Sequence, residues 1–233
     1  MKFKLAILTG LMLLVSACGV EISGEIYLAD LDELTDNNDL TTKILIALPF
    51  IETDDCEAET RRYQDVINRS SGFSTMEFVR CYPGDYGNYV EFELPAPMRM
   101  ADPYESSMVG AIEIIGFDDE ETGDRHIYIR SNPSDLCNLD KLTIDEFWQS
   151  LDFSELSPLI HINNDLREPQ KLILNHVFVN GSPVIQATEF ELERRDSIEV
   201  ALSDVITAWV FNKSCNFSSR TALIGIWVAD SGD

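Results

Sequence analysis

Five cysteines carry the thiol groups of this 233-residue chain, and no other residues point so directly to a particular chemistry. A thiol can be acylated, can pair in a disulfide, or can bind a soft metal ion such as zinc. Cys18 stands apart, because it follows an apolar stretch near the amino terminus and the small residues Ser16 and Ala17. The other four are Cys56, Cys81, Cys137 and Cys215. The two groups therefore indicate two different kinds of thiol chemistry.

The first residues are organised like a secretory signal. Lys2 and Lys4 form a basic start, and an apolar core runs from Leu5 to Val15. These eleven residues are too few for a membrane-spanning helix, which needs roughly 20 apolar residues. The leader therefore predicts export of the chain that follows it.

Val15-Ser16-Ala17-Cys18 resembles the lipobox of bacterial lipoproteins. In that family the cysteine receives a diacylglyceryl group and becomes the first residue after cleavage. The resemblance implies a signal peptide over residues 1–17 and a lipidated Cys18 that opens a short tether over residues 18–20. Each buried methylene contributes about 0.8 kcal/mol, so several acyl chains on one cysteine form a lasting anchor. Gly19 stands where inner-membrane lipoproteins tend to carry aspartate, which favours the outer membrane; the alternative is an ordinary signal cut after Ala17.

The four remaining cysteines are even in number, which suits disulfide pairing in an exported protein. Their spacings of 25, 56 and 78 residues contain no C-x-x-C pair of the kind that binds zinc. We expect Cys56 to pair with Cys81 and Cys137 with Cys215, because each bridge then closes a loop within one half of the chain. Such bridges typically contribute about 2–4 kcal/mol each. The alternative is four buried free thiols.

No catalytic or cofactor motif accompanies these thiols. The chain lacks G-x-S-x-G, a phosphate-binding loop, G-x-G-x-x-G and H-E-x-x-H. Its 41 carboxylates are too numerous for a glycosidase pair to be chosen among them. Three tryptophans could stack on sugars, but their apolar surroundings predict core positions for Trp148, Trp209 and Trp227. Three histidines in strand-like or apolar segments are expected to pack rather than to act as bases: His126, His161 and His176. We therefore expect no enzyme, no catalytic residues and no cofactor.

The exported chain is strongly acidic. Without Lys2 and Lys4 it has 15 basic and 41 acidic residues, a net charge of −26. Such a surface repels nucleic acid and anionic headgroups, so nucleic acid is excluded as a partner and the membrane must be reached through the lipid. The acidic segment Asp118–Asp124 resembles a calcium loop at its first, third, fifth and sixth positions, but its twelfth position is Ile129 instead of glutamate. A solvated hairpin tip without a metal is expected there.

Short apolar runs with strand-like alternation dominate the rest of the chain. Expected strands cover residues 21–28, 42–50, 74–82, 88–94, 109–117, 126–130, 158–163, 171–179, 182–192, 198–202, 206–211 and 221–228. Capping boxes at Asp54 and Thr143 predict two helices, and Asn180-Gly181 predicts a type I′ hairpin. The fold class is mainly β, antiparallel and sandwich-like with two short helices, or alternatively α+β. We place one β-rich domain with one helix at residues 21–130 and another at residues 131–233.

The segment Glu25-Ile26-Tyr27-Leu28-Ala29-Asp30-Leu31, followed by a strand over Ile44–Pro49 and by Cys56, is similar to uncharacterised small lipoproteins of phages and prophages. Surface exclusion is one role within that group, and the resemblance transfers no site residues. The sequence thus predicts a membrane-anchored envelope lipoprotein that acts as a non-enzymatic interaction module for an envelope protein. The alternatives are an envelope hydrolase with paired carboxylates and a surface protein that binds divalent cations.

Overall fold

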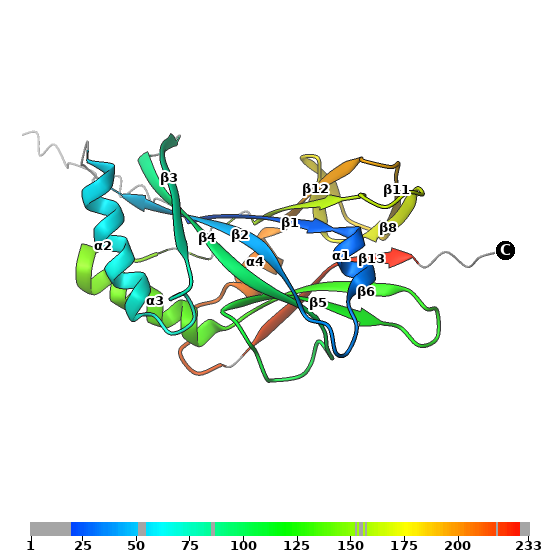
Figure 1. The fold of residues 1–233 in the computed structure, drawn as a ribbon, viewed down its shortest axis with the longest axis horizontal. Coiled ribbons are helices and arrows are strands. Elements are labelled where there is room, and N and C mark those ends of the chain that lie inside the picture. The colour runs from blue at the N-terminus through cyan, green and yellow to red at the C-terminus, as the bar shows by residue number, and fades with distance from the viewer. Residues whose placement is uncertain are drawn as a thin grey trace, which may run out of the picture.

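A computed structural model describes residues 20–50, 55–84, 87–151, 153, 156, 158–217 and 219–228. Its thirteen strands belong to one hydrogen-bonded sheet (Figure 1). They are β1 (Glu21–Tyr27), β2 (Leu40–Phe50), β3 (Glu77–Gly84), β4 (Gly87–Met100), β5 (Ile112–Asp118), β6 (Arg125–Ser131), β7 (Leu159–Asn163), β8 (Gln170–Leu174), β9 (Val177–Val179), β10 (Ser182–Val184), β11 (Thr188–Leu192), β12 (Ser197–Leu202) and β13 (Arg220–Val228). The expectation of a mainly β fold with few helices is confirmed.

The sheet curls until it nearly closes. Its strand order is β10-β9-β12-β7-β1-β2-β4-β5-β6-β13-β8-β11, with β3 paired to β4. β8 pairs with β13 and β9 pairs with β12, although only Asn175 and His176 separate β8 from β9 along the chain. His176 has a left-handed φ of 58°, which turns the chain at this point. The apolar run at 171–179, expected as one strand, therefore forms two strands that serve opposite ends of the sheet.

Most strand pairs are antiparallel, and two are parallel. β1 runs parallel to β7, from Ser23 beside Leu159 to Tyr27 beside Asn163, and β4 runs parallel to β5. β1 and β7 lie on opposite sides of residue 131, where we placed a domain boundary. Strands from both sides of that boundary thus share one sheet, and one apolar core includes residues from both sides.

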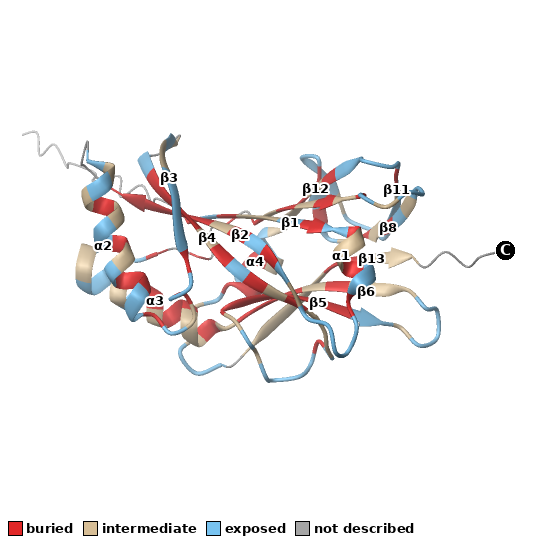
Figure 2. Ribbon diagram, viewed as in Figure 1, coloured by how far each residue is buried: buried red, intermediate tan, exposed pale blue. Residues whose placement is uncertain are grey.

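Four helices are present among the described residues: α1 (Leu28–Glu33), α2 (Cys56–Arg69), α3 (Pro133–Phe147) and α4 (Asp204–Val210). α2 and α3 pack against each other at one end of the long axis, with their buried faces turned towards the sheet (Figure 2). α2 begins one residue later than the expected cap at Asp54 implies, because the Asp55 carboxylate accepts hydrogen bonds from the backbone N–H groups of Glu57 and Ala58. No helix in this part of the chain is long and apolar enough to cross a membrane.

Three further local predictions are wrong. The run at 182–192, expected as one strand, forms β10 and β11. α3 starts at Pro133, ten residues before the expected Thr143, because Asn132 caps the helix through the Ser134 N–H and proline suits the first helical position. The segment expected as a strand at 206–211 is largely helix α4, in which Thr207 and Val210 are buried three residues apart. The β-branched and aromatic residues of α4 favour a strand, but this helical spacing overrides that preference.

Candidate functional site

The expected anchor, Cys18, lies outside the described residues. Val20, the first residue described, is only 2% exposed, and β1 begins directly after it. Two residues of chain reach at most about 7 Å, so the point where a group is attached to the backbone of Cys18 lies within that distance of Val20.

β1 starts at the end of the molecule that holds α2 and α3. Glu21 pairs with Ala47 of β2 and accepts a hydrogen bond of 2.7 Å from the Tyr82 hydroxyl. Burial, together with the neighbouring Glu21 carboxylate, raises the pKa of Tyr82. We call this region the helical end, defined by Val20, Tyr82, α2 and the last turn of α3.

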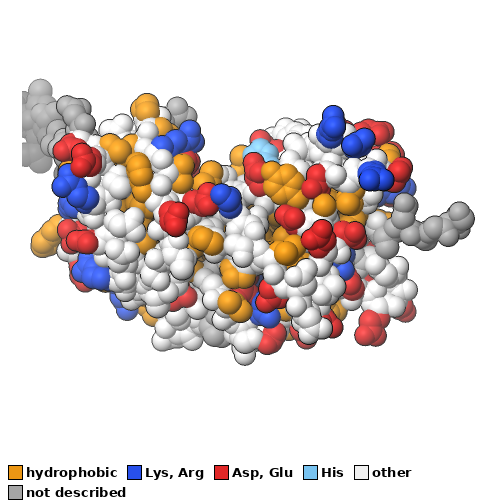
Figure 3. Space-filling view, viewed as in Figure 1, with side chains coloured by type: hydrophobic (Ala, Val, Ile, Leu, Met, Phe, Trp, Pro, Cys, Tyr) orange, Lys and Arg blue, Asp and Glu red, His pale blue; other side chains and the backbone are white. Residues whose placement is uncertain are grey.

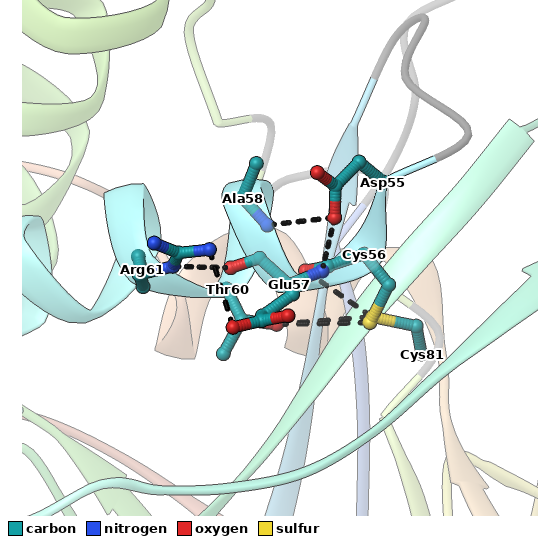
Figure 4. The surroundings of a disulfide bond; sticks show 7 residues. All are labelled: Asp55, Cys56, Glu57, Ala58, Thr60, Arg61 and Cys81. Atoms are coloured by element: carbon teal, nitrogen blue, oxygen red, sulfur yellow. Dashed lines mark hydrogen bonds and ion pairs between the residues drawn. A yellow bond between two sulfur atoms is a disulfide. The ribbon is translucent and has the colours of Figure 1, made fainter.

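Disulfides brace the two helices against the rest of the fold. Cys56 at the start of α2 is bonded to Cys81 of β3 with a Cα–Cα distance of 6.1 Å, and the Thr60 hydroxyl lies beside both sulfurs (Figure 4). Cys137 of α3 is bonded to Cys215, with a Cα–Cα distance of 5.4 Å. These are the two pairings that the loop argument favours, and they place no free thiol among the described cysteines.

A pocket of about 590 Å³ is lined by residues of α1, the tip between β5 and β6, the segment before β8 and the end of β13. Figure 1 shows α1, the β5–β6 tip and the end of β13 at the end of the long axis opposite α2 and α3. We call this cavity the distal pocket. Its charged and polar lining comprises Asp32, Asp118, Arg125, Arg167, Glu168 and Gln170, and its apolar lining comprises Leu166, Trp227 and Val228.

The groups in the distal pocket are suited to binding. Arg125 holds Asp118 with two contacts, Nε to Oδ1 at 2.6 Å and Nη2 to Oδ2 at 2.9 Å, and also donates to the carbonyl of Leu31 in α1. The Trp227 indole donates to Gln170 Oε1 at 2.8 Å. Arg167 is exposed and forms no ion pair with a described residue. The described lining contains no serine, cysteine or histidine; it offers an indole, an amide, the exposed Arg167 guanidinium and the carboxylates of Asp32, Asp118 and Glu168.

The acidic tip beside this pocket is stabilised by a carboxylate of the tip itself. Asp119 Oδ1 accepts hydrogen bonds from the N–H groups of Glu121 and Thr122, and Gly123 takes a left-handed φ of 78°. No group of three or more metal-binding side chains occurs among the residues described. Acidic side chains are spread over the face drawn in Figure 3 and do not gather in one patch.

A buried ion pair, which sequence reasoning missed, lies in the middle of the fold. Glu113 of β5 and Arg130 of β6 are both 0% exposed, and Nη2 lies 2.7 Å from Oε2. Glu113 also accepts from the N–H groups of Val109 and Gly110, and Arg130 donates to carbonyls of the same segment. The pair therefore holds the connection between β4 and β5 in place. Both charged groups have their partners inside the fold. In the sequence, the only sign of this pair is that Glu113 and Arg130 carry opposite charges and lie in neighbouring strands.

The sequence led us to expect all three tryptophans in the core, and this expectation is wrong for Trp148 and Trp209. Trp148 is 93% exposed and Trp209 is 54% exposed, whereas Trp227 is half-buried beside the distal pocket. The Arg220 guanidinium carbon lies 3.9 Å from the centre of the Trp209 ring, within cation–π range. Apolar sequence neighbours predicted burial, but neither Trp148 nor Trp209 points into the sheet.

The fold and its two ends define a disulfide-braced, mainly β protein with a mixed polar and apolar pocket. The chain belongs to the family DUF7424, a domain of unknown function, whose model matches residues 20–219. The match begins at Val20, where the described fold also begins. No curated protein and no solved structure matches the chain.

Proposed function

We propose that this protein is a lipid-anchored lipoprotein of the bacterial envelope that binds an envelope protein at its distal pocket and catalyses no reaction. The lipobox at Cys18 supports the anchor, and Gly19 favours the outer membrane. The resemblance of Glu25–Leu31 to phage and prophage lipoproteins supports an origin in such an element.

The path of β1 is the observation that carries this proposal. β1 leads from Val20 at the helical end to Tyr27, and α1 follows at once. Seven residues of strand span about 23 Å. The carbonyl of Leu31 in α1 then accepts a hydrogen bond from Arg125 in the distal pocket. A lipid at Cys18 and the distal pocket therefore belong to opposite ends of one strand, so the pocket projects away from the membrane.

The distal pocket suits a protein segment with an apolar side chain and an acidic group. Trp227 and Leu166 offer apolar contact, and Arg167, which forms no ion pair with a described residue, offers a positive charge on a protein that is otherwise acidic. A hot spot of this kind combines an aromatic ring with arginine. The remaining acidic surface speeds encounter with a basic partner and discourages acidic ones.

Photocrosslinking in living cells tests the binding face. A photoreactive residue replaces Glu168 at the distal pocket, which leaves Arg167 in place, and a matched variant carries it in place of Asp65 on the exposed side of α2. We expect a reproducible adduct from position 168 and none of the same mass from position 65. Equal adducts from both positions, or none from position 168, would contradict binding at the distal pocket.

One observation favours an envelope hydrolase as the second candidate. Burial, then the nearby Asp165 and Glu33 carboxylates, raise the pKa of Asp30, as a general acid requires. Asp165 itself accepts a hydrogen bond of 2.9 Å from the Ala29 N–H, which ties this pair to the start of α1. A glycan-degrading activity that disappears in Asp30→Asn while the distal-pocket adduct persists would favour this candidate.

A further inference from the structure

The last turns of α3 carry an exposed stripe that the fold does not use. Lys141 and Ile144 share one face of the helix because they are three residues apart, and Trp148, the residue that ends the helix, follows four residues after Ile144. Ile144 is 40% exposed and Trp148 is 93% exposed. Lys141 is exposed and forms no ion pair with any residue that the structure describes. We call these three residues the α3 stripe; Asp145 adds one negative charge beside it.

The backbone of Trp148 makes this position more unusual. Its φ of 59° and ψ of 21° are left-handed, and its N–H donates to the Ile144 carbonyl to end the helix. Glycine is the residue usually found in this conformation, because a Cβ is unfavourable there. The Trp148 side chain therefore does not pack into the core, and its Cβ makes the end of the helix less stable than a glycine would. A contact outside the chain would account for a large indole at such a place.

The α3 stripe lies at the same end of the molecule as the start of β1. Phe147 stacks on Tyr63 with ring centroids 4.3 Å apart, and the Tyr63 hydroxyl donates to the carbonyl of Pro49 in β2. Pro49 stands two residues beyond Ala47, the partner of Glu21.

We propose that the α3 stripe rests in the interface of the lipid bilayer and fixes the orientation of the protein on the membrane. This inference depends on the proposed lipid anchor at Cys18. The chain between Cys18 and the buried Val20 reaches at most about 7 Å, so lipid held there keeps the helical end at the membrane surface.

The chemistry of the stripe matches that surface. Tryptophan gathers at membrane interfaces, where its ring is in contact with apolar chains and its N–H with headgroups. Lysine extends its ammonium group to lipid phosphates while its methylenes stay on apolar surface. A net charge of −26 gives the rest of the protein no attraction to anionic lipid, so this patch and the anchor are the parts suited to contact. The distal pocket then faces away from the bilayer.

Tryptophan quenching tests this orientation on the lipidated full chain. The protein is reconstituted into phosphatidylcholine and phosphatidylethanolamine vesicles whose acyl chains carry bromine. One variant keeps only Trp148, through Trp209→Phe and Trp227→Phe. Its matched control keeps only Trp227, through Trp148→Phe and Trp209→Phe, and circular dichroism confirms that both are folded.

We expect the emission of Trp148 to fall at least twofold in brominated vesicles relative to unbrominated ones, and that of Trp227 to stay unchanged. Flotation of the vesicles reports the anchor separately. Protein that floats with the vesicles while Trp148 stays unquenched overturns the inference and leaves the anchor intact. That result would point to a protein partner or a second copy on the stripe. Protein that does not float overturns the anchor and this inference together.

Discussion

Tyr63 of α2 and Phe147 of α3 stack with ring centroids 4.3 Å apart and an angle of 24° between the ring planes. Tyr63 is fully buried, and its hydroxyl binds β2 at Pro49. The Arg62 guanidinium carbon lies 4.3 Å from the centre of the Phe147 ring. This contact holds the end of α3 against the strand that pairs with β1. The position of Trp148, one residue further on, is therefore set by the packed fold.

Replacing Trp148 by glycine should stabilise the isolated protein. Glycine removes the unfavourable Cβ at φ 59°, and the exposed indole contributes no core contact, so we expect a gain of about 1 kcal/mol in the free energy of unfolding. Urea denaturation measures this gain. Trp148→Ala is the matched control, because it removes the indole and keeps the Cβ, and it should change stability far less. A loss of stability in Trp148→Gly would mean that the indole supports the fold.

The two disulfides should differ in their contribution to stability. The Cys137–Cys215 bridge spans 78 residues and the Cys56–Cys81 bridge spans 25. Loop-closure entropy predicts losses of about 4.5 and about 3.5 kcal/mol on removing them by paired Cys→Ser substitutions. Urea denaturation of the two double variants checks the order. A larger loss from the shorter loop would indicate that local packing around Cys56 outweighs chain entropy.

Breaking the buried ion pair should be costly. Arg130→Met leaves the Glu113 carboxylate 0% exposed with only Arg99 Nε, 3.6 Å from Oε2, as a cationic partner, so we expect a loss of about 3–5 kcal/mol. Hydrogen exchange should show the loss first at residues 105–110, whose carbonyls and N–H groups the pair holds. The double variant Glu113→Gln with Arg130→Met should recover part of the loss. An Arg130→Met protein as stable as the parent would contradict the structural role given to the pair.

Stability should respond to pH through Asp30. Its pKa is raised in the folded protein, mainly by burial and then by Asp165, so the charged form opposes folding at neutral pH. As pH falls through this raised value the folded state takes up the proton first, and the cost disappears. Asp30→Asn should therefore be slightly more stable than the parent at pH 7.5, and should lose this advantage near pH 4.

Thermal unfolding at the two pH values measures that difference. Asp36→Asn, on the exposed segment after α1, serves as the control for removing one negative charge. An advantage of Asp30→Asn that grew on acidification would have the wrong sign for this account.

The fold could be predicted where short-range chemistry decides it. Asn180 and Gly181 take the positive φ values of 48° and 76° that a type I′ turn demands, and β9 and β10 pair around them. Val90, Phe92 and Leu94 are buried as their alternation predicts, although Glu91 is buried too, because Arg80 neutralises it at 2.7 Å. The two cysteine pairings are those expected when each bridge stays within one half of the chain.

Long-range relationships could not be predicted in the same way. The parallel pairing of β1 with β7 joins residues far apart in the chain, and no local pattern encodes it. The break at His176 and the exposure of Trp148 both depend on backbone torsions that neighbouring residue types do not specify. At the candidate site, the cysteines were predictable, whereas the distal pocket required the fold, since Asp32, Arg125 and Trp227 come from three distant segments.

The anchor is the central claim, and lipid labelling with intact mass tests it most directly. The full chain and its Cys18→Ala variant are expressed in a bacterium supplied with labelled palmitate, and each product is weighed with and without reductant. The account predicts label on the parent only, a mature mass that begins at Cys18 and includes the acyl chains, and four thiols that appear on reduction. An unlabelled parent released without lipid would contradict the anchor. It would also contradict the proposal that the membrane and the distal pocket lie at opposite ends of β1.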